Sequence, residues 1–196
     1  MKEANTNHPV HELIRKRWSP RAFSVKEVTV NDMKTILEAA TWAPSSSNEQ
    51  PWRYQYAFRD TPGFTALWEC LTGGNKPWTK SASVLMVCIA KKTFIRNDKD
   101  NRHYMHDCGL SNENLLLQAT SMDIYGHPMA GFDIDKTITT LKLREDEEPV
   151  CFIALGYLGN ADQLDEPNRT RETEPRTRKP VEEISADISQ YIFEEQ

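Results

Sequence analysis

Two uninterrupted apolar runs constrain the fold of this chain more than any other feature. Residues 83–90 read SVLMVCIA and residues 150–158 read VCFIALGYL, and each run has the length of a β-strand. A strand that is apolar at almost every position is buried on both faces, so it needs a covering layer on each side. The sequence therefore predicts a central sheet packed between layers of other elements.

Helical patterns surround these runs in an irregular order. A short helix is expected from about Pro9 to Trp18. Thr29 and Asp32 can form a capping box at the start of a second helix, which Pro44 would stop. Such irregular alternation is typical of an α+β or mixed α/β layered domain. We also expect a strand at 53–58, short helices at 61–71 and 77–80, and a long central helix at 103–122.

Length and charge limit the possible functions. With 196 residues the chain is long enough for one domain with a substantial core. Its net charge of −5 argues against a general nucleic-acid binder, which needs an excess of Lys and Arg. Only 38% of the residues are hydrophobic and the mean hydropathy is −0.66, so we expect part of the core to be completed by a second chain.

The setting predicted from the sequence is the cytoplasm. The four cysteines lie far apart and form no CxxC pair, so the sequence indicates no disulfide framework. Residues 1–9 are polar and lack the apolar segment of a signal peptide, and no apolar run approaches the length of a membrane span. We expect a protein that contacts neither membrane nor nucleic acid.

The last part of the chain has a different character. Residues 160–180 hold many charges, three prolines and almost no large apolar side chains, as in a disordered segment or an extended arm. A short amphipathic piece follows and needs a surface to pack on: Val181, Ile184, Ile188 and Ile192. Residues 1–196 are therefore expected to form a single domain, with 160–196 as an arm that packs on a partner subunit.

Three clusters carry the candidate chemistry. Residues 17–23 (RWSPRAF) place two arginines around a hydroxyl, which suits an anion, although a solvated basic helix end would look the same. Residues 43–53 (APSSSNEQPWR) concentrate hydroxyls and amides between two prolines, which is more rigid than an ordinary polar loop. Residues 175–180 (PRTRKP) hold three cations, either as a phosphate clamp or as a surface charge run.

Other site types find less support. His103, His106 and Cys108 lie within six positions, but they do not complete a standard zinc set, and we expect a polar helix start with no metal. The chain contains neither a GxGxxG nor a GxxxxGK[ST] loop, so a Rossmann or P-loop nucleotide site is not predicted.

Taken together, the clusters resemble the flavin-binding segments of the nitroreductase family in order and spacing. The Ala-Pro-Ser-Ser-x-Asn-x-Gln-Pro-Trp block at Ala43–Trp52 is the most specific of them. The resemblance covers roughly residues 10 to 185. Its other parts are Arg17–Phe23, Gly74-Asn75 with Trp78, Asn114–Ala119, His127–Asp133, Pro149–Tyr157 and Arg178–Pro180.

The resemblance implies a fold and a cofactor. The fold would be the three-layer α/β/α nitroreductase fold of the α+β class, with a mainly antiparallel central sheet flanked by helices. The C-terminal arm would be exchanged in a homodimer, and FMN would lie at the interface. The chain departs from one subgroup of the family by carrying Ala130 where that subgroup has a Glu near the flavin, and Trp18 replaces a residue that is usually small or basic.

The resemblance also implies roles for single residues. The FMN phosphate and ribityl chain would be gripped by Arg17, Ser19, Arg176 and Arg178, with Arg21 near the pyrimidine edge of the ring. The partner subunit would contribute the loop that follows Pro44, and the Gly131 backbone N–H would face the reactive ring nitrogen. The full set of cofactor-binding residues implied is Arg17, Trp18, Ser19, Arg21, Pro44, Ser45, Ser46, Asn48, Gln50, Asn75, Pro128, Met129, Ala130, Gly131, Arg176 and Arg178.

The implied activity is hydride transfer from NAD(P)H, the co-substrate, to a nitroaromatic, quinone or related electrophilic small molecule by a ping-pong scheme. Because the flavin performs the hydride chemistry, no catalytic side chain is predicted and the protein supplies position and electrostatics. Relatives of the fold that reduce enones or dehalogenate aromatics are an alternative, for which residues 91–103 are the candidate pocket lid. A non-catalytic flavin carrier or sensor is another, and a phosphate-binding module without flavin is a third.

Overall fold

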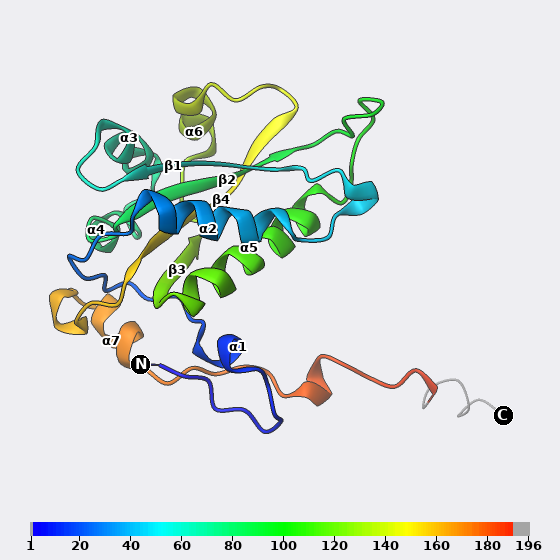
Figure 1. Ribbon diagram of the computed structural model, residues 1–196. Helices are drawn as coiled ribbons and strands as arrows, with labels where there is room; N and C mark the ends of the chain where they lie inside the picture. The colour runs from blue at the N-terminus through cyan, green and yellow to red at the C-terminus, as the bar shows by residue number, and fades with distance from the viewer. Residues whose placement is uncertain (1, 190–196) are drawn as a thin grey trace.

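Two buried strands form the centre of the sheet, in a computed structural model that describes residues 2–189 (Figure 1). β2 (Val84–Lys91) pairs with β4 (Glu147–Tyr157), and the apolar runs predicted as buried strands are confirmed. β1 (Trp52–Phe58) lies outside β2, and β3 (Ile124–Met129) lies outside β4. All three pairings are antiparallel, as the family resemblance implied.

Helices cover both faces of this sheet. α2 (Val30–Thr41) and α5 (Tyr104–Ser121) lie on one face, and α3 (Pro62–Cys70), α4 (Lys76–Thr79) and α6 (Ile134–Leu141) lie on the other (Figure 1). Alternation along β2 supplies both cores, since Met86 packs toward α2 and α5 whereas Leu85 and Val87 pack toward α3. The predicted three-layer architecture is confirmed.

Local sequence signals set several helix boundaries. The Thr29 hydroxyl accepts from the Asp32 N–H at 3.1 Å, and the Asp32 carboxylate accepts from the Thr29 N–H at 2.8 Å, so the predicted capping box is present. The helix predicted from about Pro9 is shorter, and α1 spans Glu12–Lys16. Short 3₁₀ segments, η1 (Ser46–Asn48), η2 (Ala161–Gln163) and η3 (Val181–Glu183), lie in the connections.

The sequence did not predict β3 and α6. β3 contains Gly126 and Pro128, which are both rare in strands, and Pro128 is tolerated because β3 is an edge strand. α6 is rich in Ile and Thr, whose branched side chains lower helix propensity. Its start is fixed by the Asp133 carboxylate, which accepts from the Lys136 N–H at 2.9 Å.

The C-terminal region first packs on its own chain and then leaves it. α7 (Asn168–Thr173) follows η2, and Leu164 and Glu172 are buried. The segment after α7 passes α1 and projects away from the body (Figure 1). The exposed side chains of Val181, Ile184 and Ile188 belong to this projecting part, whereas Ile192 lies outside the described residues.

Gly126 marks a place where no side chain fits. A Cβ on Gly126 would lie 2.3 Å from Cδ2 of Leu116 and 3.0 Å from Cδ2 of Leu155. We expect Gly126→Ala to lower the free energy of unfolding by about 2 kcal/mol through overpacking, measured by urea denaturation. Gly109→Ala is the matched control: it lies in α5 with nothing within 4 Å, so it should raise that free energy by ~0.5 kcal/mol. Equal effects of the two substitutions would contradict the packing argument.

Candidate functional site

A buried carboxylate fixes the backbone at Arg21. Glu172, on α7, is only 7% exposed, and its two carboxylate oxygens accept from the Arg21 N–H at 2.9 and 3.1 Å. The same carboxylate accepts from the Ala22 N–H at 3.0 Å. Because an unpaired carboxylate is unfavourable at such a position, these bonds tie α7 firmly to the segment that carries Arg21.

Arg21 lies in a stack with two aromatic rings. Its guanidinium carbon is 6.0 Å from the centre of the Trp78 ring, and the Trp78 ring is 4.6 Å from the His127 ring. Burial lowers the pKa of His127 to about 4, with the nearby Arg21 charge acting in the same direction. The imidazole is therefore neutral at pH 7, and Nδ1 donates to the Pro20 carbonyl at 2.9 Å.

A second set of hydrogen bonds joins the loops at Asn75 and Gly131. The Gly131 carbonyl accepts from the Asn75 amide, the Thr72 hydroxyl and the Thr72 N–H, each at 3.0 Å. A Cβ at Gly131 would lie 2.7 Å from Nδ2 of Asn75, so the close approach needs glycine. These bonds fix the end of β3 beside α4, the helix that contains Trp78.

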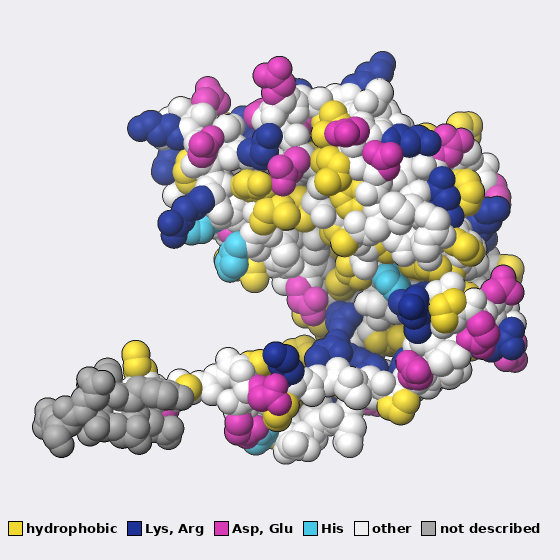
Figure 2. Space-filling model, turned by 180° about the vertical axis from the view of Figure 1, so that it is seen from behind, with side chains coloured by type: hydrophobic (Ala, Val, Ile, Leu, Met, Phe, Trp, Pro, Cys, Tyr) yellow, Lys and Arg dark blue, Asp and Glu magenta, His cyan; other side chains and the backbone are white. Residues whose placement is uncertain are grey.

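Arg17 lies near Arg176 and Arg178, which come from the other end of the sequence. Burial lowers the pKa of Arg176, and the nearby charges of Arg17 and Arg178 act in the same direction. Arg17 has one acidic neighbour, Glu113, at 3.8 Å, while the Arg178 guanidinium bonds only the carbonyl of Thr177 among the described residues. Figure 2 shows Lys and Arg side chains gathered in the hollow between the body and the projecting C-terminal segment.

The loop at 45–50 is shaped by unusual backbone angles. Ser47, Asn48 and Gln50 have φ values of 53°, 56° and 48°, in the left-handed region. The Ser45 hydroxyl accepts from the Gln50 N–H at 3.0 Å, and the buried Asp107 carboxylate accepts from the Ser46 N–H at 3.0 Å. These two hydrogen bonds thus hold the loop in a backbone conformation that most residues avoid.

The predicted lid is attached to this loop. Residues 93–100 form a narrow turn closed by a bridge between Thr93 and Asp100. The Glu49 carboxylate accepts from the Ile95 N–H at 2.8 Å and lies 4.0 Å from Arg96. No hydrogen bond or ion pair within residues 2–189 connects the 45–50 loop to Gly131 or to the cluster of Arg17, Arg176 and Arg178.

The structure therefore divides the predicted site residues into two groups. Four segments meet within one chain, namely 17–21, 75–78, 127–131 and 176–178, while the 45–50 loop lies apart from them. Within the first group the side chains of Trp18 and Met129 are buried, so at these two positions the side chain is not available to line a ligand. Pro128 and Ala130 are exposed.

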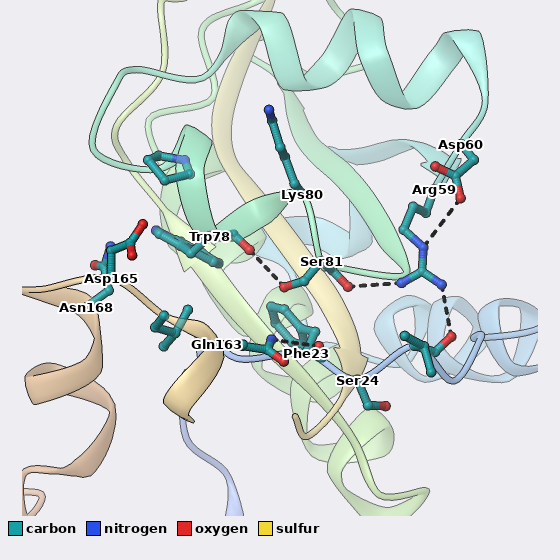
Figure 3. A pocket seen from close by; sticks show the side chains of 13 residues that line it. Phe23, Ser24, Arg59, Asp60, Trp78, Lys80, Ser81, Gln163, Asp165 and Asn168 are labelled. Atoms are coloured by element: carbon teal, nitrogen blue, oxygen red, sulfur yellow. Dashed lines mark hydrogen bonds and ion pairs between the residues drawn. The ribbon is translucent and has the colours of Figure 1, made fainter. Parts of the chain in front are cut away.

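A separate cavity of about 540 Å³ opens beside Trp78 (Figure 3). None of the residues predicted to bind flavin lines it. Its polar groups serve the fold, since the Arg59 guanidinium donates to the Ser81 carbonyl at 3.1 Å and the Gln163 amide donates to the Phe23 carbonyl at 2.9 Å. The cavity and the arginine cluster are thus distinct features.

The metal alternative has no geometric basis in the described part of the chain. Cys108 is fully buried, whereas the His106 side chain is exposed and its Nδ1 lies 3.2 Å from Asp107. Among residues 2–189 no three His, Cys, Asp or Glu side chains are grouped closely enough to hold a metal ion.

None of the helices in residues 2–189 combines the length and the apolar composition of a membrane span.

Comparison with known proteins decides the family. The sequence profile described as "Nitroreductase family" matches residues 14–61 and 55–157. The chain belongs to the nitroreductase family. The match covers the segment 17–21, the 45–50 loop and all four strands of the sheet.

Two solved structures and one relative known by sequence support this placement. A crystal structure described as an oxidoreductase containing FMN superimposes with a TM-score of 0.90 at 31% identity, covering 95% of this chain and 96% of that one. A nitroreductase family protein from Streptococcus pneumoniae gives a TM-score of 0.72 at 25% identity, covering 90% of this chain and 98% of that one. An Archaeoglobus fulgidus protein named "Putative NADH dehydrogenase/NAD(P)H nitroreductase" is 31% identical over 150 residues, 74% of this chain and 83% of its own length.

Sequence reasoning missed three residues that hold the Arg21 and Gly131 segments in place. Glu172 lies in a charged segment of the arm, where nothing in the sequence separates a buried carboxylate from its exposed neighbours. Thr72 bears no motif of its own. His127 was part of the resemblance but had no assigned role, and its burial beside Trp78 appears only in the fold.

Removing the Glu172 carboxylate should loosen the Arg21 segment. We expect Glu172→Ala to lower the free energy of unfolding by about 2 kcal/mol, because two backbone N–H groups lose a charged acceptor. Urea denaturation followed by circular dichroism measures this effect. The control Glu174→Ala changes an exposed side chain on the same segment and should stay within about 0.5 kcal/mol. A loss as large in the control would show that the net charge matters more than the three bonds.

His127 should make stability depend on pH. Burial lowers the pKa of folded His127 to about 4, below the ordinary histidine value of 6.5, so the unfolded chain binds more protons between pH 4 and pH 6.5. The stability that neutral, buried His127 contributes is therefore fully present above pH 6.5 and is lost as the pH falls toward 4. We expect the wild type to lose about 1.5 kcal/mol more than His127→Gln between pH 6.5 and pH 5, measured by urea denaturation at both pH values. His8→Gln, at an exposed histidine, should keep the wild-type pH dependence.

Proposed function

We propose that this nitroreductase family member is an FMN-dependent oxidoreductase that transfers hydride from NAD(P)H to nitroaromatic, quinone or related electrophilic small molecules. The observation that carries the proposal is the meeting of Arg17, Arg176 and Arg178 in a protein of net charge −5. Guanidinium groups crowded together repel one another, and an anion with several oxygens relieves that repulsion through bidentate hydrogen bonds. The FMN phosphate has this chemistry.

The donor set fits the rest of the cofactor as well. The exposed residues Pro128 and Ala130 and the Asn75 segment lie at one end of β3, beside the half-buried Arg21. We propose that Arg17 and Ser19, with Arg176 and Arg178, hold the phosphate and ribityl chain, and that the Gly131 N–H faces the ring. The relative at 31% identity, whose structure is described as containing FMN, supports FMN as the cofactor.

The proposed mechanism needs no nucleophilic side chain. FMN, when bound, supplies the hydride chemistry between the nicotinamide and the acceptor, which would use the same face in turn. Arg21 would present a positive charge where negative charge develops, with its backbone fixed by Glu172 and its guanidinium beside the Trp78 ring. His127 stays neutral and holds the Pro20 carbonyl, so it adds no competing charge.

We propose that the complete site forms in a homodimer. The 45–50 loop, with Ser45, Ser46, Asn48 and Gln50 after Pro44, would then meet the arginine cluster of the partner. Two apolar surfaces support this arrangement. Trp42 is 80% exposed beside Leu117, and the projecting segment carries Val181, Ile184 and Ile188. The arm of one subunit packing on the other would cover both.

An absorbance spectrum of the purified protein, followed by anaerobic addition of NADPH and separately of NADH, tests the activity. We expect flavin bands that bleach with a reduced nicotinamide and recover with a nitroaromatic or a quinone. A protein that neither contains nor takes up FMN would overturn the proposal. A yellow protein that neither nucleotide reduces would instead indicate a flavin carrier or sensor, and reduction without nitro or quinone turnover would favour the enone reductases and dehalogenases of the fold.

The arginine assignment can be tested separately from turnover. Arg178 is exposed and its guanidinium bonds only a neighbouring carbonyl among the described residues, so Arg178→Ala should fold normally. We expect this variant to raise the Kd for FMN by about tenfold or more, the effect of losing a charge-assisted hydrogen bond. Quenching of flavin fluorescence during titration of the apoprotein measures it. Lys34→Ala, which removes an exposed positive charge on α2, should leave the Kd within about twofold.

A further inference from the structure

The first described residues of the chain lie against the arginine cluster. The Ala4 N–H donates to the Arg15 carbonyl at 2.9 Å, beside the C-terminal end of α1. One nitrogen of the Arg176 guanidinium donates both to this Arg15 carbonyl at 2.8 Å and to the Lys2 carbonyl at 3.2 Å. Arg176 is thus held between α1 and the segment Lys2–Ala4.

The Lys2 side chain makes a second connection. Its ammonium donates to the Arg171 carbonyl at 2.8 Å, near the end of α7, and lies 5.2 Å from the centre of the Trp18 ring. A cation is favourable at the carbonyl end of a helix. α7 also carries Glu172, which holds the Arg21 backbone. Lys2 therefore joins Arg176 of the arginine cluster, through its carbonyl, to α7, through its ammonium.

The charges around Lys2 show why such a connection matters. Lys2 interacts with Glu172 and Glu174, but also with the like charges of Arg21 and Arg176. Arg176 in turn faces Arg17 and Arg178. These cations repel one another without a bound anion, so contacts that do not involve the anion are needed to keep them together.

We propose that Lys2–Ala4 is an N-terminal strap that holds the anion site assembled, with Lys2 as its positioning residue. This inference rests on the proposed function in one respect, namely that the anion is the FMN phosphate. The strap orders Arg176 and α7 before the phosphate arrives. By linkage, phosphate binding stabilises the strap to the same degree that the strap strengthens phosphate binding.

Three variants test the strap. Lys2→Met removes the ammonium but keeps the backbone carbonyl, and deletion of residues 2–7 removes both together with the Ala4 bond. Lys34→Met is the matched control, since it removes the ammonium of an exposed lysine on α2, outside the strap. Each variant is titrated with FMN by fluorescence quenching. The apoprotein of each is also digested briefly with trypsin, and cleavage after Arg176 and Arg178 is followed by mass spectrometry.

We expect Lys2→Met to raise the Kd for FMN by about fivefold and the deletion by about thirtyfold or more, corresponding to one and several lost hydrogen bonds. Cleavage after Arg176 in the apoprotein should become about tenfold faster in the deletion variant, because Arg176 loses its anchor. Lys34→Met should match the wild type in both measurements.

The outcomes separate this inference from the proposed function. If the wild type binds no FMN, the proposed function fails, whereas trypsin cleavage of the apoprotein still reports on the strap. If FMN binds and neither Lys2→Met nor the deletion changes the Kd or the cleavage rate, the strap is overturned. Should the deletion variant not fold, Lys2→Met decides, because it leaves the backbone contacts of the segment in place.

Discussion

The three hydrogen bonds from Glu172 to the backbone of Arg21 and Ala22 are the contact on which the site depends. They join two segments separated by about 150 positions, and they fix the segment whose Arg21 side chain lies beside Trp78. A buried carboxylate is stable only when its oxygens accept several bonds, so α7 has one position in which Glu172 is satisfied. The position of α7 in turn sets where the following residues, including Arg176, begin.

The sheet provides the rigid support for this arrangement. The edge strand β3 pairs antiparallel with the central strand β4. Near the end of β3 the His127 ring packs against the Trp78 ring, and just after it the Gly131 carbonyl accepts from the Asn75 amide. Polar groups at the end of an edge strand can be reached by a ligand, while the same strand packs Met129 into the core. The site residues are therefore held by elements that cannot shift without disturbing both cores.

Much of the fold could be predicted because its signals are local. Continuous apolar runs identified β2 and β4, and the Thr29–Asp32 pair identified the start of α2. β3 could not be predicted, because Gly126 is there for the close approach of Leu116 and Leu155, a contact between distant elements. For the site, spacing identified the cationic segments and the 45–50 loop. It could not identify Glu172 or Lys2, since their partners lie about 150 positions away or more in the sequence.

The left-handed residues of the 45–50 loop have a consequence for how tightly a ligand can be held. A flexible loop loses conformational freedom when it closes on a ligand, and the affinity falls by that amount. Here Ser47, Asn48 and Gln50 occupy a sparsely populated region, and the loop is held by hydrogen bonds to Asp107 and Ser45 of the same chain. Because the protein's own contacts impose this order, a ligand that meets the loop would lose less affinity to the ordering of its backbone.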